Sequence, residues 1–271
     1  MTSVDPTING VRTAAPDHFA PSNIVLLIAT KEAVELLASP RGLAWLAMLT
    51  AVLSAFSLLF VANTELSLLD NAQVVYEMLG VVTVLGALLG VVAGADAIAG
   101  ERERGSLMPL LLAPISRPQL LWGKLGGPIA AWITMLVLAG PYLWAVGSSG
   151  QNLFSGGLIL ALFGTPVVLG FGFAALGLGA RLGSSRTALS LCLTGLVLSA
   201  SPLLLGPSLR QSVIGRVFDA VNPLSGALNA YDAVVIDSQS ILAQGVHALP
   251  VFAWLVLTLW FAIRSVRSLS R

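Results

Sequence analysis

Long apolar stretches, separated by short groups of charged residues, form the dominant pattern of this sequence. An ionised side chain at the centre of a bilayer costs at least about 2.5 to 3.5 kcal/mol, and a helix needs about 20 apolar residues to cross it. The charges therefore mark the ends of the spans, and a polar break at residues 147–152 divides the longest apolar run in two. The pattern predicts six membrane-spanning helices, at about residues 42–62, 76–98, 119–146, 155–180, 187–206 and 247–264.

The composition agrees with this pattern: of 271 residues, 56% are hydrophobic and only 10% are charged, and the mean hydropathy is +0.89. In soluble domains about a quarter of the residues are charged, so an ordinary soluble protein is excluded. The single cysteine excludes a disulfide scaffold, and 14 Lys and Arg against 13 Asp and Glu exclude the basic surplus of a nucleic-acid binder. The sequence therefore predicts an all-α, polytopic membrane protein with no nucleic-acid partner.

The distribution of basic residues predicts the orientation, because short loops rich in Lys and Arg stay in the cytoplasm. Six spans put both termini on one side, and placing them inside leaves only Arg210 and Arg216 of the basic residues outside. We therefore expect both termini to be cytoplasmic. Residues 1–22 are polar and are expected to form a mobile cytoplasmic tail, followed by a single transmembrane domain over residues 23–271.

A short segment at residues 24–39 precedes the first span and is too charged to cross a bilayer. Lys31, Glu35 and Ser39 recur every four residues on one helical face, with apolar residues around the other. This pattern is typical of a helix that lies at the headgroups of the membrane, and Ser39-Pro40 is expected to end it.

The loop at residues 99–118, between the second and third predicted spans, is densely charged and then abruptly apolar. Gly100 is expected to end the preceding helix, and Ser106 to cap a short helix with Pro109 in its first turn. The leucines of this short helix are too few to span and too apolar for water. They predict a contact with lipid, with other segments of the chain or with a partner protein.

The sequence of this loop carries a family resemblance. The run from Asp96 to Leu107 (DAIAGERERGSL), followed by LLLAPISR at residues 110–117 and by Gly123-Lys124, closely resembles the cytoplasmic loop of ABC-2 type transporter permeases. In that family the loop forms a coupling helix that docks on a separate ATPase subunit. The resemblance assigns the ATPase contact here to Glu101, Arg102, Glu103, Arg104, Gly105, Ser106, Leu107, Leu110, Leu111 and Arg117.

Two further segments resemble the family. The stretch from residue 31 to residue 41 resembles its N-terminal elbow helix, and Asn222-Pro223 resembles a recurrent pair in its outer loop. By this resemblance the outer loop, here residues 206–246, is expected to fold as short outer helices. In the elbow helix the candidate residues are Lys31, Glu32 and Glu35.

One position departs from the family pattern. Met108 stands where the family commonly has an acidic residue, so the polar contacts with the ATPase are expected at residues 101–104. In organisation the chain is similar to the short six-span permeases of sodium efflux and of nitrous oxide reductase maturation.

The resemblance implies the permease subunit of an ATP-binding cassette exporter in the cytoplasmic (inner) membrane of a bacterium. It also implies two copies of the permease, as a homodimer, and two ATPase subunits that carry ATP and Mg²⁺. The chain has no P-loop of its own, because Gly123-Lys124 is followed by Leu125 and lacks the glycine-rich lead. We therefore expect it not to be an enzyme by itself and to bind no cofactor or metal, whereas the cargo and any extracytoplasmic partner are left open.

Glycines recur every four residues in the second predicted span, at Gly86, Gly90 and Gly94. Because glycine lets two helices approach closely, this spacing predicts tight helix packing, either within the bundle or between two protomers.

Two alternatives come from other classes of protein. Gly147-Ser148-Ser149-Gly150 matches the Gly-x-Ser-Gly of rhomboid proteases, and His247 lies on the same predicted outer side. Ser149 and His247 are thus candidates for a serine nucleophile and its base. The four residues are also an ordinary turn between spans, and a noncatalytic membrane scaffold is the other alternative.

Overall fold

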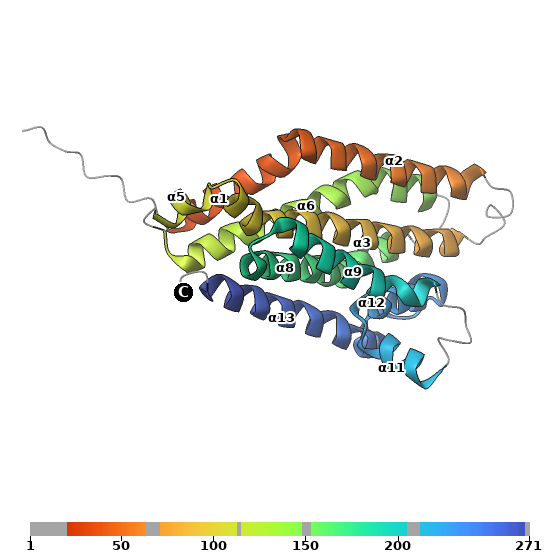
Figure 1. Cartoon of the computed structure of the whole chain (residues 1–271). Helices are drawn as coiled ribbons and strands as arrows, with labels where there is room; N and C mark the ends of the chain where they lie inside the picture. The colour runs from red at the N-terminus through yellow and green to blue at the C-terminus, as the bar shows by residue number, and fades with distance from the viewer. Residues whose placement is uncertain (1–20, 63–70, 113–114, 148–152, 205–211, 269–271) are drawn as a thin grey trace, which may run out of the picture.

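The computed structural model describes residues 21–62, 71–112, 115–147, 153–204 and 212–268, and every regular element in these residues is a helix (Figure 1). Five helices of this described part are long and apolar enough to cross a membrane: Pro40–Phe60, Asn71–Glu103, Pro118–Gly147, Leu153–Leu182 and Gly245–Arg267. They coincide with five of the six predicted spans. The predicted all-α, polytopic membrane fold is therefore confirmed.

The helices run side by side as one bundle (Figure 1). At one end, called the loop end below, lie α1, α5 and the C-terminal turn of α13, and at the other, the far end, lie α11 and α12. The elements in chain order are α1 (Pro21–Ala38), α2 (Pro40–Ala62), α3 (Asn71–Ala95), the π-helical turn η2 (Asp96–Gly100), α4 (Glu101–Glu103), α5 (Leu107–Leu112), α6 (Arg117–Gly147), α7 (Leu153–Ile159), the π-helical turn η3 (Leu160–Gly164), α8 (Thr165–Leu182), α9 (Ser185–Leu204), α11 (Val213–Val221), α12 (Pro223–Tyr231), the π-helical turn η4 (Asp232–Ile236), the 3₁₀ turn η5 (Ile241–Ala243) and α13 (Gly245–Arg267).

The first two helices join at Ser39, as Ser39-Pro40 predicts. The Ser39 Oγ accepts a hydrogen bond from Gly42 N at 3.0 Å, which caps the start of α2. Helix α1 then lies directly against α6, because a Cβ atom at Gly123 would come within 2.5 Å of the Ile28 side chain. One face of the elbow helix is therefore covered by protein.

The centre of the bundle is the contact between α3 and α8. A Cβ atom at Gly94 would lie 2.1 Å from the carbonyl oxygen of Gly172, and one at Gly86 would lie 2.5 Å from the Trp132 ring. At Gly90 the nearest atom is the Val168 carbonyl oxygen, at 3.3 Å. The predicted glycine face of the second span thus lies inside one chain, where it lets α3 approach α6 and α8.

The second span continues past Gly100, so the expectation that Gly100 ends this helix is wrong. The chain adds one wide π turn, η2, and runs on through α4 to Glu103. Gly100 serves a different purpose, because a Cβ atom there would lie 1.9 Å from Asp96 Oδ1. The residue is needed for the close approach of a side chain and not for a helix end.

The fifth predicted span, residues 187–206, corresponds to α9. Twenty helical residues extend about 30 Å, which matches the hydrocarbon thickness of a bilayer. Helix α9 packs against α3 and α8. Its predicted end lies outside the described residues, so a sixth span stays a prediction.

The outer segment, residues 206–246, is not only a surface loop. Nearly every residue of α12 is buried, and the Tyr231 hydroxyl lies 2.9 Å from the Thr83 hydroxyl of α3. Asn222 starts α12 by accepting a hydrogen bond from Leu224 N at 3.0 Å, and its side-chain amide donates to Ser199 O at 2.7 Å. Asn222 thus caps α12, and Pro223 takes its first position, where the missing N–H costs nothing, which explains why the Asn-Pro pair stands here.

Candidate functional site

The end of α4 determines how the loop between α3 and α6 turns. Gly105 has a φ of +73°, which glycine adopts without steric cost. Gly105 N donates to Arg102 O at 3.1 Å, and Ser106 N donates to Glu101 O at 2.9 Å. This pair of bonds is a Schellman motif, which satisfies the last carbonyls of a helix. The helix thus ends at Glu103, and the glycine that closes it is Gly105 and not Gly100.

Ser106 precedes α5 but does not cap it as predicted. Its Oγ donates to Glu101 O at 3.3 Å. A capping side chain accepts a hydrogen bond from the second or third residue of its helix, and the third residue of α5 is Pro109, which has no N–H. Ser106 therefore closes α4 instead of opening α5.

Four charged side chains meet where α1, α4 and α6 come together at the loop end. Lys124 Nζ lies 2.6 Å from Glu32 Oε1 and 2.8 Å from Glu101 Oε2. Lys31 Nζ lies 2.5 Å from Glu101 Oε1. The side chains of Lys124 and Glu101 are only 1% and 3% exposed. We call these four residues the charged junction; it balances two carboxylates with two ammonium groups, and only Lys31, at 53% exposure, reaches bulk water.

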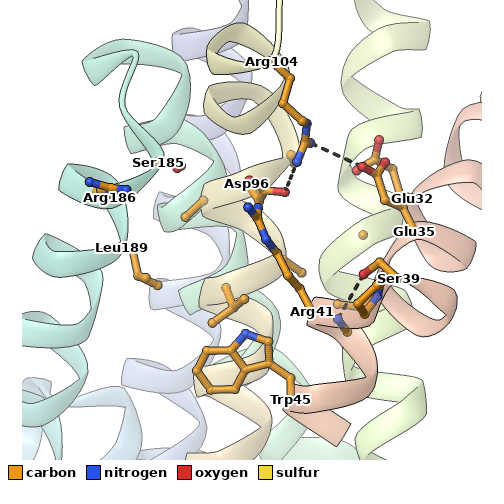
Figure 2. A pocket seen from close by; sticks show the side chains of 18 residues that line it. Glu32, Glu35, Ser39, Arg41, Trp45, Asp96, Arg104, Ser185, Arg186 and Leu189 are labelled. Carbon is orange, nitrogen blue, oxygen red and sulfur yellow. Dashed lines mark hydrogen bonds and ion pairs between the residues drawn. The ribbon is translucent and has the colours of Figure 1, made fainter. Parts of the chain in front are cut away.

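A second, more exposed set of ion pairs lies beside the charged junction. Arg104 Nη1 is 3.0 Å from Asp96 Oδ2, and Arg104 Nη2 is 3.4 Å from Glu35 Oε1 (Figure 2). Lys31 also lies 4.0 Å from Glu35. Water screens pairs of this exposure, so each stabilises the fold by less than about 1 kcal/mol.

The remaining charges of α4 contact the turn between α8 and α9. The Glu103 carboxylate accepts hydrogen bonds from Ser185 N and Ser185 Oγ, both at 2.8 Å, at the start of α9. Arg102 Nη2 donates to Ala180 O at 3.4 Å. The turn itself passes through Gly183, whose φ is +70°. The loop therefore contacts α8 and α9 as well as α1 and α6.

Helix α5 has one buried side and one exposed side. Leu107 is buried in an apolar cluster with residues of η2, α6, α8 and α13. Met108 and Leu112, by contrast, are 66% and 80% exposed. We call these two residues the α5 tip. An apolar tip held by a buried anchor is the kind of surface that a partner protein can cover.

The charges around α1 change the pKa values of its side chains. Burial raises the pKa of the Glu32 carboxyl above 4.5, and attraction to the Lys124 ammonium opposes this rise. Burial lowers the pKa of Lys31, but the hydrogen bond to Glu101 and the attraction of Glu101, Glu32 and Glu35 together outweigh burial and raise that pKa above 10.5. Lys31 is therefore fully charged at neutral pH.

The structure separates the predicted ATPase-contact residues by location. Glu101 and Leu107 are buried, so the expectation that Glu101 offers a surface charge to a partner is wrong in this structure. Desolvation by α1 and α6 is the reason, and Lys31 and Lys124 compensate its charge. The side chains of residues 110, 111 and 117 are not among those that the structure describes. The exposed members are Arg102, Glu103, Arg104, Gly105 and Ser106.

The sequence did not identify three residues as part of the site: Asp96, Lys124 and Ser185. Lys124 could have been noticed, because it is a charge six residues inside the predicted third span, where an unpaired ammonium would be costly. Asp96 and Ser185 carry no such signal, since only the folded chain brings them to Arg104 and Glu103.

A pocket of about 530 Å³ opens between α1, α2, α3 and α9, next to these ion pairs (Figure 2). Its apolar lining includes Leu36, Trp45 and Leu189, and its charged lining carries both carboxylates and arginines. Glu32 of the charged junction forms part of its wall.

Comparison with known families gives one match, to the model described as ABC-2 family transporter protein, over residues 23–268. This match covers almost the whole chain. The chain belongs to the ABC-2 transporter family. It is thus a multi-pass transmembrane permease of the ABC transporter type, and permeases of this family normally work with an ABC ATPase subunit. The search of curated proteins found no match.

Membership of a transport family gives the protease and scaffold alternatives no support. His247 lies in the first turn of α13, and its backbone oxygen faces the site of Gly226 on α12. Ser149 lies outside the described residues, so the serine–histidine pair is not tested.

Proposed function

We propose that this ABC-2 permease is the membrane subunit of an exporter that a separate ABC ATPase drives from the loop end. The observation that carries this proposal is the contrast within one short loop. The α5 tip is apolar and exposed, whereas the residues that precede it make contacts to α1, α6, α8 and α9. A partner that covers the tip could move four helices through one small contact.

The loop end is, in this proposal, the cytoplasmic end. The basic residues that the positive-inside rule counts lie on this side, including Arg102, Arg104 and the two arginines in the last turn of α13. Both termini are then cytoplasmic, and the membrane is the inner membrane of a bacterium. ATP and Mg²⁺ are bound by the ATPase and not by this chain.

In the proposed mechanism, the ATPase shifts an equilibrium between two arrangements of the helices in the bundle. ATP-driven closure of the ATPases would displace the α5 tip, and a partner can shift such an equilibrium only through contacts that differ between the two states. The charged junction carries the displacement to α1 and α6, because its buried charges must move together or lose their compensation. The same loop carries it to α9 through Glu103 and Ser185.

The proposed assembly has two permease copies and two ATPases, so that two α5 tips are engaged at once. The export direction and the homodimer come from the family resemblance. Neither is needed for the contact that the α5 tip would make.

The test of this proposal is a change at the α5 tip alone. Met108→Asp combined with Leu112→Asp places charge on the proposed contact and leaves Leu107 in its cluster. Recovery of a co-expressed ABC ATPase partner, after purification through a tag on the permease, is expected to fall by more than about tenfold.

The matched control is Ile214→Asp on α11, an apolar residue that is 83% exposed at the far end. This variant should recover the ATPase normally. Normal recovery with the tip variant, when both variants fold and express equally, would contradict the proposed contact.

A further inference from the structure

The pocket between α1, α2, α3 and α9 contains charges that the coupling proposal does not use. Arg41, Arg104 and Arg186 line it together with Glu32, Glu35 and Asp96 (Figure 2). Some of these charged side chains form ion pairs with other residues and some do not. The unpaired ones indicate the charge of the ligand.

The carboxylates of the pocket already face cations. Glu32 lies 2.6 Å from Lys124, and Arg104 lies within 3.4 Å of both Glu35 and Asp96. Lys124 compensates Glu32, Arg104 is shared by Glu35 and Asp96, and Glu103 faces Arg186, so Arg41 is the one charge of the lining without a charged partner among the described residues. The pocket can therefore take a ligand group with a single negative charge at Arg41.

All three arginines of the pocket are exposed, but Arg104 is engaged by Glu35 and Asp96, which leaves Arg41 and Arg186 for a ligand. Within the described residues Arg41 makes no hydrogen bond or ion pair, and Arg186 has a coulombic interaction with Glu103. A guanidinium group binds phosphate oxygens through two parallel N–H donors, so these two side chains can hold a phosphodiester.

The depth of the pocket selects the kind of phosphodiester. Arg41 is the second residue of the span Pro40–Phe60, so it marks the level at which that helix leaves the membrane. Trp45, one turn further in, has the position of an interfacial aromatic residue. Leu36 and Leu189 continue the apolar lining beside it. A ligand here has its charge at the headgroup level and its apolar part below.

We propose that this pocket binds an anionic phospholipid of the membrane leaflet at the loop end, with the phosphate at Arg41 and Arg186 and the upper acyl chain against Trp45. The volume of about 530 Å³ lies within the range of ligand pockets and suits a headgroup with the first part of a chain. The proposal does not depend on ATPase coupling, because every group in it belongs to this chain.

The experiment measures quenching of Trp45 fluorescence in the purified full chain, in micelles, by phosphatidylglycerol brominated on the upper part of its acyl chain. The chain has 6 Trp, so the Trp45 signal is the difference between the wild type and Trp45→Phe. This difference is expected to saturate with added lipid. Arg41→Gln and Arg186→Gln should each raise the half-saturating concentration about fivefold, the value of one arginine near an anionic surface.

Three comparisons make the assay decisive. Arg216→Gln, an exposed arginine on α11, should leave the half-saturating concentration unchanged, and Arg41→Lys should raise it less than Arg41→Gln. Brominated phosphatidylcholine, which has no net charge, should need a higher concentration than phosphatidylglycerol.

Several results would overturn the proposal: no quenching that depends on Trp45, equal binding of the two lipids, or no effect of the glutamine variants. Competition by water-soluble glycerophosphoglycerol at the same concentration as the lipid would show a site for free phosphodiesters and would also overturn it. No ATPase is present in this assay, so its failure leaves the coupling proposal unaffected.

Discussion

The centre of the bundle and its loop end hold helices together by opposite means. Between α3 and α8 the contact is made by shape, with backbone atoms so close that Gly94 has no room for a Cβ atom beside Gly172. At the loop end α1, α4 and α6 are connected by charge, through Lys124 and the carboxylates on either side of it. A steric contact of this kind has one arrangement, whereas Lys124 contacts both Glu32 and Glu101, and Glu101 contacts both Lys124 and Lys31, so each charge keeps a partner when the helices shift. The part of the molecule suited to respond to a partner is therefore the charged junction.

The largest expected effect comes from removing Lys124, the buried cation of the charged junction. Lys124→Met leaves Glu32 and Glu101 buried together without their shared ammonium, which should destabilise the folded chain by about 3 to 5 kcal/mol. Thermal unfolding of the purified chain in detergent measures this loss.

Two further variants show whether charge is the reason. Combining Lys124→Met with Glu32→Gln and Glu101→Gln removes the buried charges and should recover most of the lost stability. Arg104→Gln, which breaks only exposed pairs, should cost less than about 1 kcal/mol. If the triple variant were as unstable as Lys124→Met, shape and not charge would hold this end together.

The second effect tests the central contact. Gly94→Ala places a methyl group against the backbone of α8, which cannot yield as a flexible side chain would, and should cost about 3 kcal/mol. The same unfolding assay measures it.

The matched control is Gly140→Ala in α6, where a Cβ atom would meet nothing within 4 Å. This variant should be neutral or slightly stabilising. A loss of equal size at Gly140 would show that helix propensity or insertion, and not close packing, governs the glycine positions.

The smallest effect is the pH dependence that α1 contributes at the loop end. Because the pKa of Lys31 is raised when folded, its contribution is complete below pH 10.5 and is lost as the pH rises through the folded value. The pKa of Glu32 is also raised, so the folded chain binds a proton above pH 4.5 that the unfolded chain releases, and stability falls as the pH rises through that window.

The unfolding temperature as a function of pH measures both contributions. Lys31→Met should reduce the loss of stability above pH 10.5, and Glu32→Gln should reduce the loss of stability as the pH rises above 4.5. The Gly94→Ala variant should keep the pH profile of the wild type, at a lower temperature throughout.

The sequence alone predicted those features of the fold that a single segment carries by itself, without reference to its neighbours. Hydropathy located the five confirmed spans, because each must cover the thickness of a bilayer with its own residues. The spacing of Gly86, Gly90 and Gly94 likewise predicted a close helix contact, and only its partner, α8, required the structure.

The rest could not be predicted because it depends on partners far apart in the chain. Glu101 resembles its neighbours Glu103 and Arg104 in sequence, and only the arrival of α1 and α6 buries it. The helix end was misplaced at Gly100 because glycine serves both helix ends and close approaches, and the sequence does not show the Asp96 carboxylate beside it. Residues 223–231 are too short and too mixed to be recognised as a buried helix.

The wide turn at Asp96–Gly100 determines the direction in which each later side chain of the same helix points. A π turn holds one residue more than an α turn, and one residue corresponds to about 100° of rotation around the axis. Without that extra residue Glu101 would point about a quarter of a turn away from Lys124, and Glu103 would turn away from α9 to the same extent. A single additional residue within the helix thus determines which neighbour each acidic side chain of α4 meets.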